Sequence, residues 1–134
     1  MRSLENHLAV VTGASQGIGR AIALGLAAKR VALVLVARNS AALQEVAERA
    51  RSSSPCVRCH AVDLTMDEAI TGIRESLSSQ LDGLDVLVHC AGAFSIGDLQ
   101  SASVEELDRL YRANVRMPYL LTQSLLPMLK RRKG

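Results

Sequence analysis

Three closely spaced glycines follow an apolar run near the start of the chain. The run begins at Leu8, the glycines are Gly13, Gly17 and Gly19, and an apolar helical pattern starts at Ala21. Glycine turns through positive φ and lets other atoms approach its backbone, and the first N–H groups of a helix attract phosphate. The spacing therefore predicts a strand, a turn and a helix that bind the phosphates of a dinucleotide; a tight turn that binds nothing is the alternative. The residues predicted to contact the cofactor here are Gly13, Ser15, Gln16, Gly17, Ile18 and Gly19.

An arginine follows the second apolar run, which covers residues 31–37. In a dinucleotide-binding unit the second strand ends beside the adenosine ribose. An acidic side chain there favours NAD, whereas an arginine can pair with the 2′-phosphate of NADP. Arg38 and its neighbour Asn39 therefore favour NADP, with NAD as the alternative cofactor. Gln16 supplies no second positive charge in the glycine turn, and an ordinary surface arginine is the other interpretation of Arg38.

Residues 12–19 read Thr-Gly-x-x-x-Gly-x-Gly. This motif resembles that of the short-chain dehydrogenase/reductase family, whose members transfer hydride between a nicotinamide cofactor and a carbonyl or alcohol. Ala91 and Gly92 match the end of that family's Asn-Asn-Ala-Gly segment, with His89 and Cys90 at the two asparagine positions. The resemblance implies that the nucleotide passes close to the backbone of Ala91 and Gly92, beside His89. We interpret His89 as a structural histidine on a buried strand rather than a general base.

Two further positions continue the resemblance. Asp63 and Leu64 follow the third apolar run, and the resemblance implies that Asp63 bonds the adenine amino group, beside the backbone N–H of Leu64. Asn114 lies four residues before Pro118, which has no N–H, so the carbonyl of Asn114 loses its helical partner. The resemblance implies that this carbonyl holds the water of a proton relay, which makes Asn114 the one predicted catalytic residue. The alternatives are a simple chain turn at Asp63 and a kink filled by a neighbouring side chain at Asn114.

The family's catalytic serine lies after its fifth strand, and a Tyr-x-x-x-Lys motif follows on the next helix; neither feature is present in this sequence. Tyr111 is followed at the fourth place by Val115, and Tyr119 by Gln123. We therefore expect residues 1–134 to form one NADP-binding domain that stops before the fifth strand and is inactive alone. At the level of the family, the predicted function is NADP-dependent interconversion of a carbonyl and an alcohol on a small-molecule substrate. A non-catalytic nucleotide-binding or interaction module is the alternative.

The rest of the pattern supplies the elements that position these residues. Short apolar runs alternate with amphipathic helical patterns, which predicts an α/β fold. The resemblance to the family implies a Rossmann-type doubly wound parallel sheet with strand order 3-2-1-4, right-handed crossovers and helices on both faces. Strands are expected from Leu8 and at 31–37, 57–62 and 85–89. Helices are expected after the glycine turn, at 40–51, over a buried face from Met66 to Leu81, and at 103–131.

Three local features bear on the ends and faces of these helices. Arg30 stands where the first helix would normally end on a glycine. Thr65 and Ser103 each precede a glutamate by three residues, which predicts two capping boxes. Asn114 falls on the expected buried face of the long helix, which comprises Leu107, Leu110, Tyr111, Asn114, Pro118 and Leu121.

Composition bounds the remaining possibilities. The net charge of +3 is concentrated in the basic run 130–133, so we expect no nucleic-acid or membrane partner. No apolar run reaches membrane-spanning length, and we expect a cytoplasmic protein. Cys56, Cys59 and His60 match a haem-attachment motif, but residues three apart on a strand point to opposite faces, so no metal is expected. The helix 103–131 is apolar on more than one side, which favours a homo-oligomer.

Overall fold

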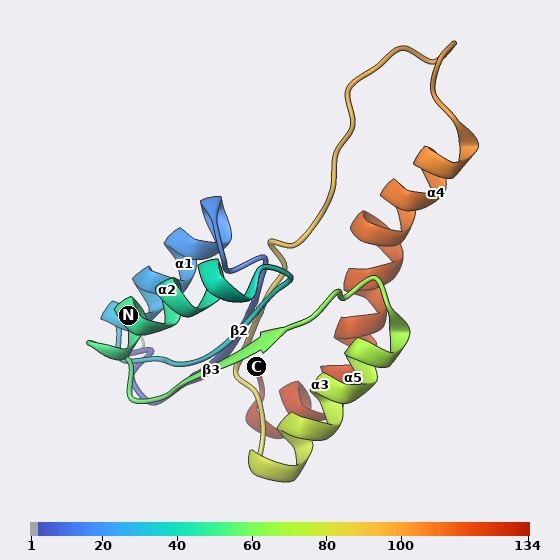
Figure 1. Ribbon diagram of the computed structural model, residues 1–134. Coiled ribbons are helices and arrows are strands. Elements are labelled where there is room, and N and C mark those ends of the chain that lie inside the picture. Colours follow the sequence, from blue (N-terminus) through green and yellow to red (C-terminus); the bar gives the residue numbers. More distant parts are fainter. Residues whose placement is uncertain (1–2) are drawn as a thin grey trace.

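Four parallel strands form the centre of the computed structural model, which describes residues 3–134 (Figure 1). The strands are β1 (Leu8–Thr12), β2 (Ala32–Ala37), β3 (Val57–Ala61) and β4 (Val86–Val88), and their order in the sheet is β3-β2-β1-β4. The predicted α/β architecture and strand order are therefore confirmed. Residues 1 and 2 of the predicted domain lie outside the described part.

Helices cover both faces of the sheet. Figure 1 shows α1 (Gly17–Ala28) and α2 (Ser40–Arg51) on one side, and α3 (Asp67–Gln80) and α5 (Met117–Arg132) on the other. The core between the sheet and the pair α1 and α2 is rich in alanine and valine, including Ala9 and Val11 of β1 and Ala23 of α1. The core on the opposite side contains larger side chains from the helices, among them Ile73 of α3 and Leu121 and Met128 of α5. Small residues let α1 and α2 lie close to the strands that carry the glycine turn.

The predicted helix 103–131 is three consecutive elements. It comprises α4 (Val104–Tyr111), a π-helical turn η1 (Arg112–Arg116) and α5, with Pro118 as the second residue of α5. Proline is tolerated in a first helical turn, where its missing N–H costs little. The interruption expected from Pro118 is thus present as a widened turn just before it, a kind of helical irregularity that is frequent at functional sites.

The expected buried face of the long helix is wrong in its first half. In Figure 1, α4 and the loop before it extend away from the sheet, and no residue of α4 is buried. Leu107 and Tyr111 are more than half exposed, and Asn114 is exposed as well. Apart from Ala113 in η1, burial begins at Met117 and continues through Leu121, Leu125 and Met128. The apolar spacing is the same on both halves, but only the second half lies against the sheet and α3.

The strand ends differ by small amounts from those expected. The second strand begins at Ala32, the third ends at Ala61, and the fourth is limited to Val86–Val88. In the described sheet β4 pairs only with β1, so its outer side is an edge. Asp85 accepts a hydrogen bond from the N–H of Leu8 on its carboxylate, 2.8 Å away, and this side-chain contact lies at the start of the strand.

One of the two predicted capping boxes is wrong. The Ser103 hydroxyl accepts from the N–H of Glu106 at 3.1 Å, as expected for the start of α4. At α3 the N-cap is Met66, which is exposed and has no capping side chain. Thr65 instead donates both its N–H and its hydroxyl to Asp63, at 3.0 and 2.8 Å. The aspartate two residues earlier thus engages the threonine in a local turn before the helix begins.

The end of α1 places Arg30 in a conformation that suits glycine. Its φ is 60°, in the left-handed region, and its N–H donates to the carbonyl of Ala27 at 2.8 Å. A helix that ends in this geometry usually has a glycine at this position, whereas here an arginine adopts it. Its side chain pairs with Glu5 at 2.9 Å, but both side chains are at least half exposed, so the pair contributes little.

We predict that Arg30→Gly raises the free energy of unfolding by about 0.5–1 kcal/mol, because a left-handed residue with a Cβ is strained and the lost surface ion pair offsets only part of that gain. Lys29→Gly is the matched control. Lys29 has φ −93°, so glycine there only adds freedom to the unfolded chain and lowers stability. Urea denaturation of both variants measures the difference, and a loss of stability in both would contradict the prediction.

Candidate functional site

The glycine turn adopts the conformations that its sequence predicts. Gly13 has φ 63° and Gly17 has φ 54°, both in the left-handed region. Gly17 is the first residue of α1, and the N-cap residue Gln16 makes no side-chain capping bond. No acidic residue lies in the first turn of α1. The start of this helix therefore keeps N–H groups and a positive dipole end for an anion.

Two of the glycines are required by contact with neighbouring backbone. A Cβ on Gly13 would lie 2.7 Å from backbone atoms of Cys90 and Ala91, and a Cβ on Gly19 would collide with the carbonyl of Gly13. A Cβ on Gly17 would meet nothing within 4 Å. Gly17 is thus needed for its φ alone, and the space beside it is open. The turn is closed toward the sheet and open toward solvent, which is the form a phosphate cradle requires.

Thr12 holds this turn against the segment after β4. The threonine is fully buried, and its hydroxyl donates to the carbonyl of Val88 at 3.3 Å. The same oxygen accepts from the N–H groups of Cys90 and Ala91, each at 3.1 Å. The glycine motif includes Thr12 but predicts no separate role for it. The available signal was a hydroxyl at the end of an otherwise aliphatic strand, since a buried polar group needs partners.

Arg38 and Asp63 lie near one another at the carboxyl ends of β2 and β3. Hydrogen bonds from Thr65 lower the pKa of Asp63, and the positive charge of Arg38 acts in the same direction. Both side chains are exposed, whereas that of Leu64 is buried in the core. Asn39 accepts from the N–H of Ala42 at 3.0 Å and so caps α2. The two charged groups are therefore available to a ligand at this edge, while the side chain of Asn39 is engaged by the helix.

Asn114 joins the π-helical turn to the loop after β4. Its amide donates to the carbonyl of Ala93 at 2.7 Å and accepts from the N–H of Ala93 at 3.0 Å. A Cβ on Gly92 would lie 2.7 Å from the Asn114 side-chain oxygen, so the glycine allows this approach. These two bonds to Ala93 give the Asn114 side chain its hydrogen-bond partners. The side chain is nevertheless exposed, although the helical spacing predicted that it would be buried.

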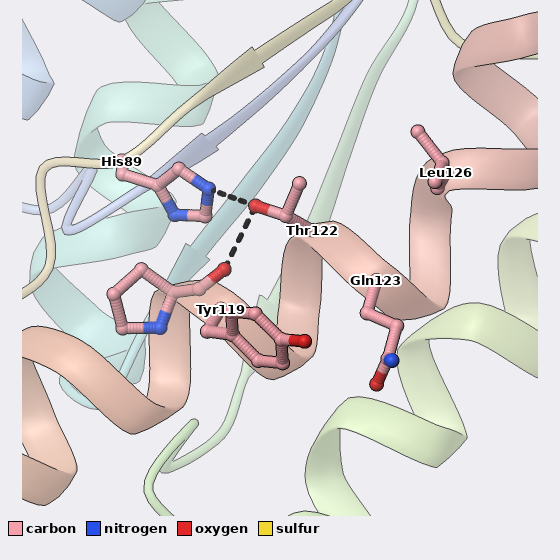
Figure 2. Close-up of a pocket in the computed structure, with 6 residues that line it drawn as sticks. His89, Tyr119, Thr122, Gln123 and Leu126 are labelled. Carbon is pink, nitrogen blue, oxygen red and sulfur yellow. Dashed lines mark hydrogen bonds between the residues drawn. The ribbon is translucent and has the colours of Figure 1, made fainter.

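His89 is exposed at the end of β4, which corrects its expected place on a buried strand. Figure 2 shows its ring directed at Thr122, with 2.9 Å between Nε2 and the hydroxyl. That hydroxyl donates to the carbonyl of Pro118 at 2.8 Å, so Nε2 of His89 is the donor to Thr122. His89 therefore braces β4 to α5, and partial desolvation lowers its pKa. His89 borders an open cavity of about 490 Å³, which is also lined by Pro118, Tyr119, Thr122, Gln123 and Leu126.

Most of the predicted site residues meet along one edge of the sheet, at the carboxyl ends of the strands. The glycine turn, Ala91 and Gly92 lie between β1 and β4, Arg38 and Asp63 lie beside β2 and β3, and Asn114 reaches the same edge through Ala93. Within residues 3–134 no three side chains of the kinds that bind metals are grouped to hold an ion. No helix of that range is both long and apolar enough to cross a membrane.

Comparison with known proteins gives consistent matches. A sequence model described as short chain dehydrogenase matches residues 7–134. An uncharacterized oxidoreductase of Staphylococcus saprophyticus is 36% identical over 134 residues, which cover 92% of this chain and 57% of that protein. The chain spans about half the length of the curated relatives it matches.

Solved structures of similar sequence have the same fold over this range. L-sorbose reductase from Gluconobacter frateurii, complexed with NADPH and L-sorbose, is 33% identical with a TM-score of 0.91, over 97% of this chain and 50% of that chain. An alcohol dehydrogenase from the archaeon Thermococcus sibiricus, complexed with 5-hydroxy-NADP, is 31% identical with a TM-score of 0.90, over 97% of this chain and 56% of that chain.

We predict that Thr12→Val lowers the free energy of unfolding by about 1–3 kcal/mol, because the N–H groups of Cys90 and Ala91 lose their acceptor while the volume is kept. Thr12→Ser is the control, since it retains the hydroxyl and removes only a methyl group. Urea denaturation compares the two variants. Equal losses in valine and serine variants would show that the methyl group, and not the hydroxyl, matters at this position.

Proposed function

The chain belongs to the short-chain dehydrogenase family, and we propose that it is the NADP-binding part of an oxidoreductase that interconverts a carbonyl and an alcohol. The observation that carries the proposal is the glycine turn. It combines two left-handed glycines, an α1 start without a capping side chain, and open space beside Gly17. These features fit a pyrophosphate held by backbone N–H groups, and the residues assigned to it are Gly13, Ser15, Gln16, Gly17, Ile18 and Gly19.

The adenosine end of the cofactor is assigned to the edge beside β2 and β3. Arg38 is exposed and directly follows β2, where its guanidinium can pair with a 2′-phosphate. Asn39 lies next to it and supports the start of α2. Asp63 and the backbone of Leu64 are assigned to the adenine. Because Thr65 engages only Oδ1 of Asp63, the other carboxylate oxygen is available to accept from an amino group.

The nicotinamide end is assigned to the segment from His89 to Gly92 and to Asn114. Small residues let a ligand approach the backbone of Ala91 and Gly92, and His89 holds β4 against α5 beside them. A bound nicotinamide cofactor would supply the hydride chemistry. Asn114 is proposed to position a water through its backbone carbonyl. The activity is proposed for the whole protein, because the chain spans about half the length of its relatives.

We further propose that the molecule pairs with a second copy through the exposed side of α4, η1 and the first turn of α5. Residues Val104, Leu107, Tyr111, Val115 and Tyr119 recur every three or four positions, and each is more than half exposed. Such spacing places the five side chains in one apolar stripe along the helical elements, and a contiguous exposed apolar patch typically marks an interaction surface. We name these five residues the α4 stripe.

We predict that Leu107→Lys shifts the protein toward the monomer in analytical ultracentrifugation at micromolar concentration, because it places a charge in the α4 stripe. Glu105→Lys introduces the same side chain on the same helix outside the stripe, and we expect it to leave the association unchanged. A wild-type protein that sediments as a monomer, or equal effects of the two variants, would contradict the assignment of the stripe to a second copy.

We predict that Arg38→Asp weakens binding of adenosine 2′,5′-bisphosphate by about 10-fold or more, since a charge-assisted contact to phosphate contributes roughly 1.5–3 kcal/mol. Binding of 5′-AMP, which lacks the 2′-phosphate, should change much less. Isothermal titration calorimetry measures both ligands. Arg49→Asp makes the same charge change in the last turn of α2 and serves as the control. Equal losses for the two ligands would contradict the assignment of Arg38 to the 2′-phosphate.

A further inference from the structure

A two-bond ion pair joins the π-helical turn to the start of α3. The guanidinium of Arg116 donates to both oxygens of Asp67, at 2.5 and 2.7 Å. Arg116 is the last residue of η1 and Asp67 is the first residue of α3, and they lie 49 positions apart in the sequence. The planar fork of an arginine fixes the direction as well as the distance of a carboxylate, so the pair sets the relative orientation of two separate elements.

The two partners adjoin opposite ends of the proposed cofactor site. Asp67 follows the Asp63–Thr65 turn, which is assigned to the adenine side. Arg116 lies two residues after Asn114, whose side chain holds Ala93 on the nicotinamide side. Three sets of side-chain bonds, joined by the backbone of residues 65–67 and 114–116, therefore connect the segment after β3 to the segment after β4.

The π-helical turn has little other support on its outer side. Ala113 is its only buried residue, α4 before it buries none, and Pro118 after it offers no N–H. The bonds of Asn114 to Ala93 fix the turn toward the sheet, and the fork of Arg116 fixes it toward α3. Without that fork, one of these two attachments is lost.

The ionised forms of Arg116 and Asp67 are each favoured by their surroundings. The hydrogen bonds from Arg116 lower the pKa of Asp67, and the same bonds raise the pKa of Arg116, so both groups stay ionised at neutral pH. Asp67 also lies at the positive end of α3, which has no capping side chain. Both side chains are about half exposed, at 41% and 48%, so the pair is a weak source of overall stability and its geometric effect is the larger one.

We propose that Arg116 is a positioning residue for the dinucleotide: its fork on Asp67 holds the π-helical turn at the spacing that lets the adenosine and nicotinamide ends of the site bind one ligand. The inference rests on the proposed NADP site. A positioning role and a purely structural role of the ion pair predict different effects on ligand binding. A structural pair would support all ligands equally, whereas a positioning pair matters only to a ligand that spans both ends.

The test compares NADP, which spans the site, with adenosine 2′,5′-bisphosphate, which occupies one end. We expect Arg116→Gln and Asp67→Asn each to weaken NADP binding about two- to fivefold, the range that an exposed ion pair allows, and to leave binding of the bisphosphate unchanged. The double variant should lose no more than either single variant, since both changes remove one interaction. Arg116→Lys keeps the charge without the fork and should recover only part of the NADP affinity.

Arg109→Gln is the matched control, because Arg109 makes a similar fork to Glu106 within α4 and joins no second element. It should leave both affinities unchanged. Equal loss of the two ligands in Arg116→Gln, or unchanged NADP affinity, would overturn the positioning role. Failure of the wild-type protein to bind the bisphosphate would instead overturn the proposed function, and the inference with it.

Discussion

Three backbone segments lie in close contact around Gly13, and this contact constrains the structure around it. The residue lies against Cys90 and Ala91 on one side, and Gly19 lies against its carbonyl on the other. The buried hydroxyl of Thr12 fixes the same junction with three hydrogen bonds. These contacts hold the start of α1 and the segment after β4 against the end of β1. Backbone contacts of this kind leave little room for compensation by neighbouring side chains.

Features that depend on neighbouring residues in the chain could be predicted from the sequence. The alternation of apolar runs and helical patterns predicted the four strands, and the resemblance of the motifs to the family predicted their order in the sheet. The left-handed Gly13 and Gly17 and the cap at Ser103 are similarly local. At Arg30 the residue type does not match the backbone conformation. The end of α1 requires a left-handed residue, and the arginine adopts that conformation although its Cβ makes it strained.

Features that depend on where an element lies in space could not be predicted. The apolar period of residues 104–121 is uniform, yet α4 extends past the sheet and only α5 is buried, so Asn114 is exposed. Asp63 competes for Thr65 and displaces the predicted cap, since two local turns are equally compatible with the sequence. The brace from His89 to Thr122 and the fork from Arg116 to Asp67 join residues 33 and 49 positions apart, and no local pattern identifies such partners.

The strand order also determines when the glycine turn is completed during synthesis. β1, β2 and β3 are consecutive in the chain, but β1 receives its second neighbour only when β4 arrives. Cys90 follows Thr12 by 78 residues, which at a ribosomal rate of about 5–20 residues per second is about 4–16 seconds. Throughout that interval the glycine turn exists without Cys90 and Ala91 beside it, and one side of β1 is an open edge. During that interval β1, which later lies between β2 and β4, is open to unwanted pairing along one side.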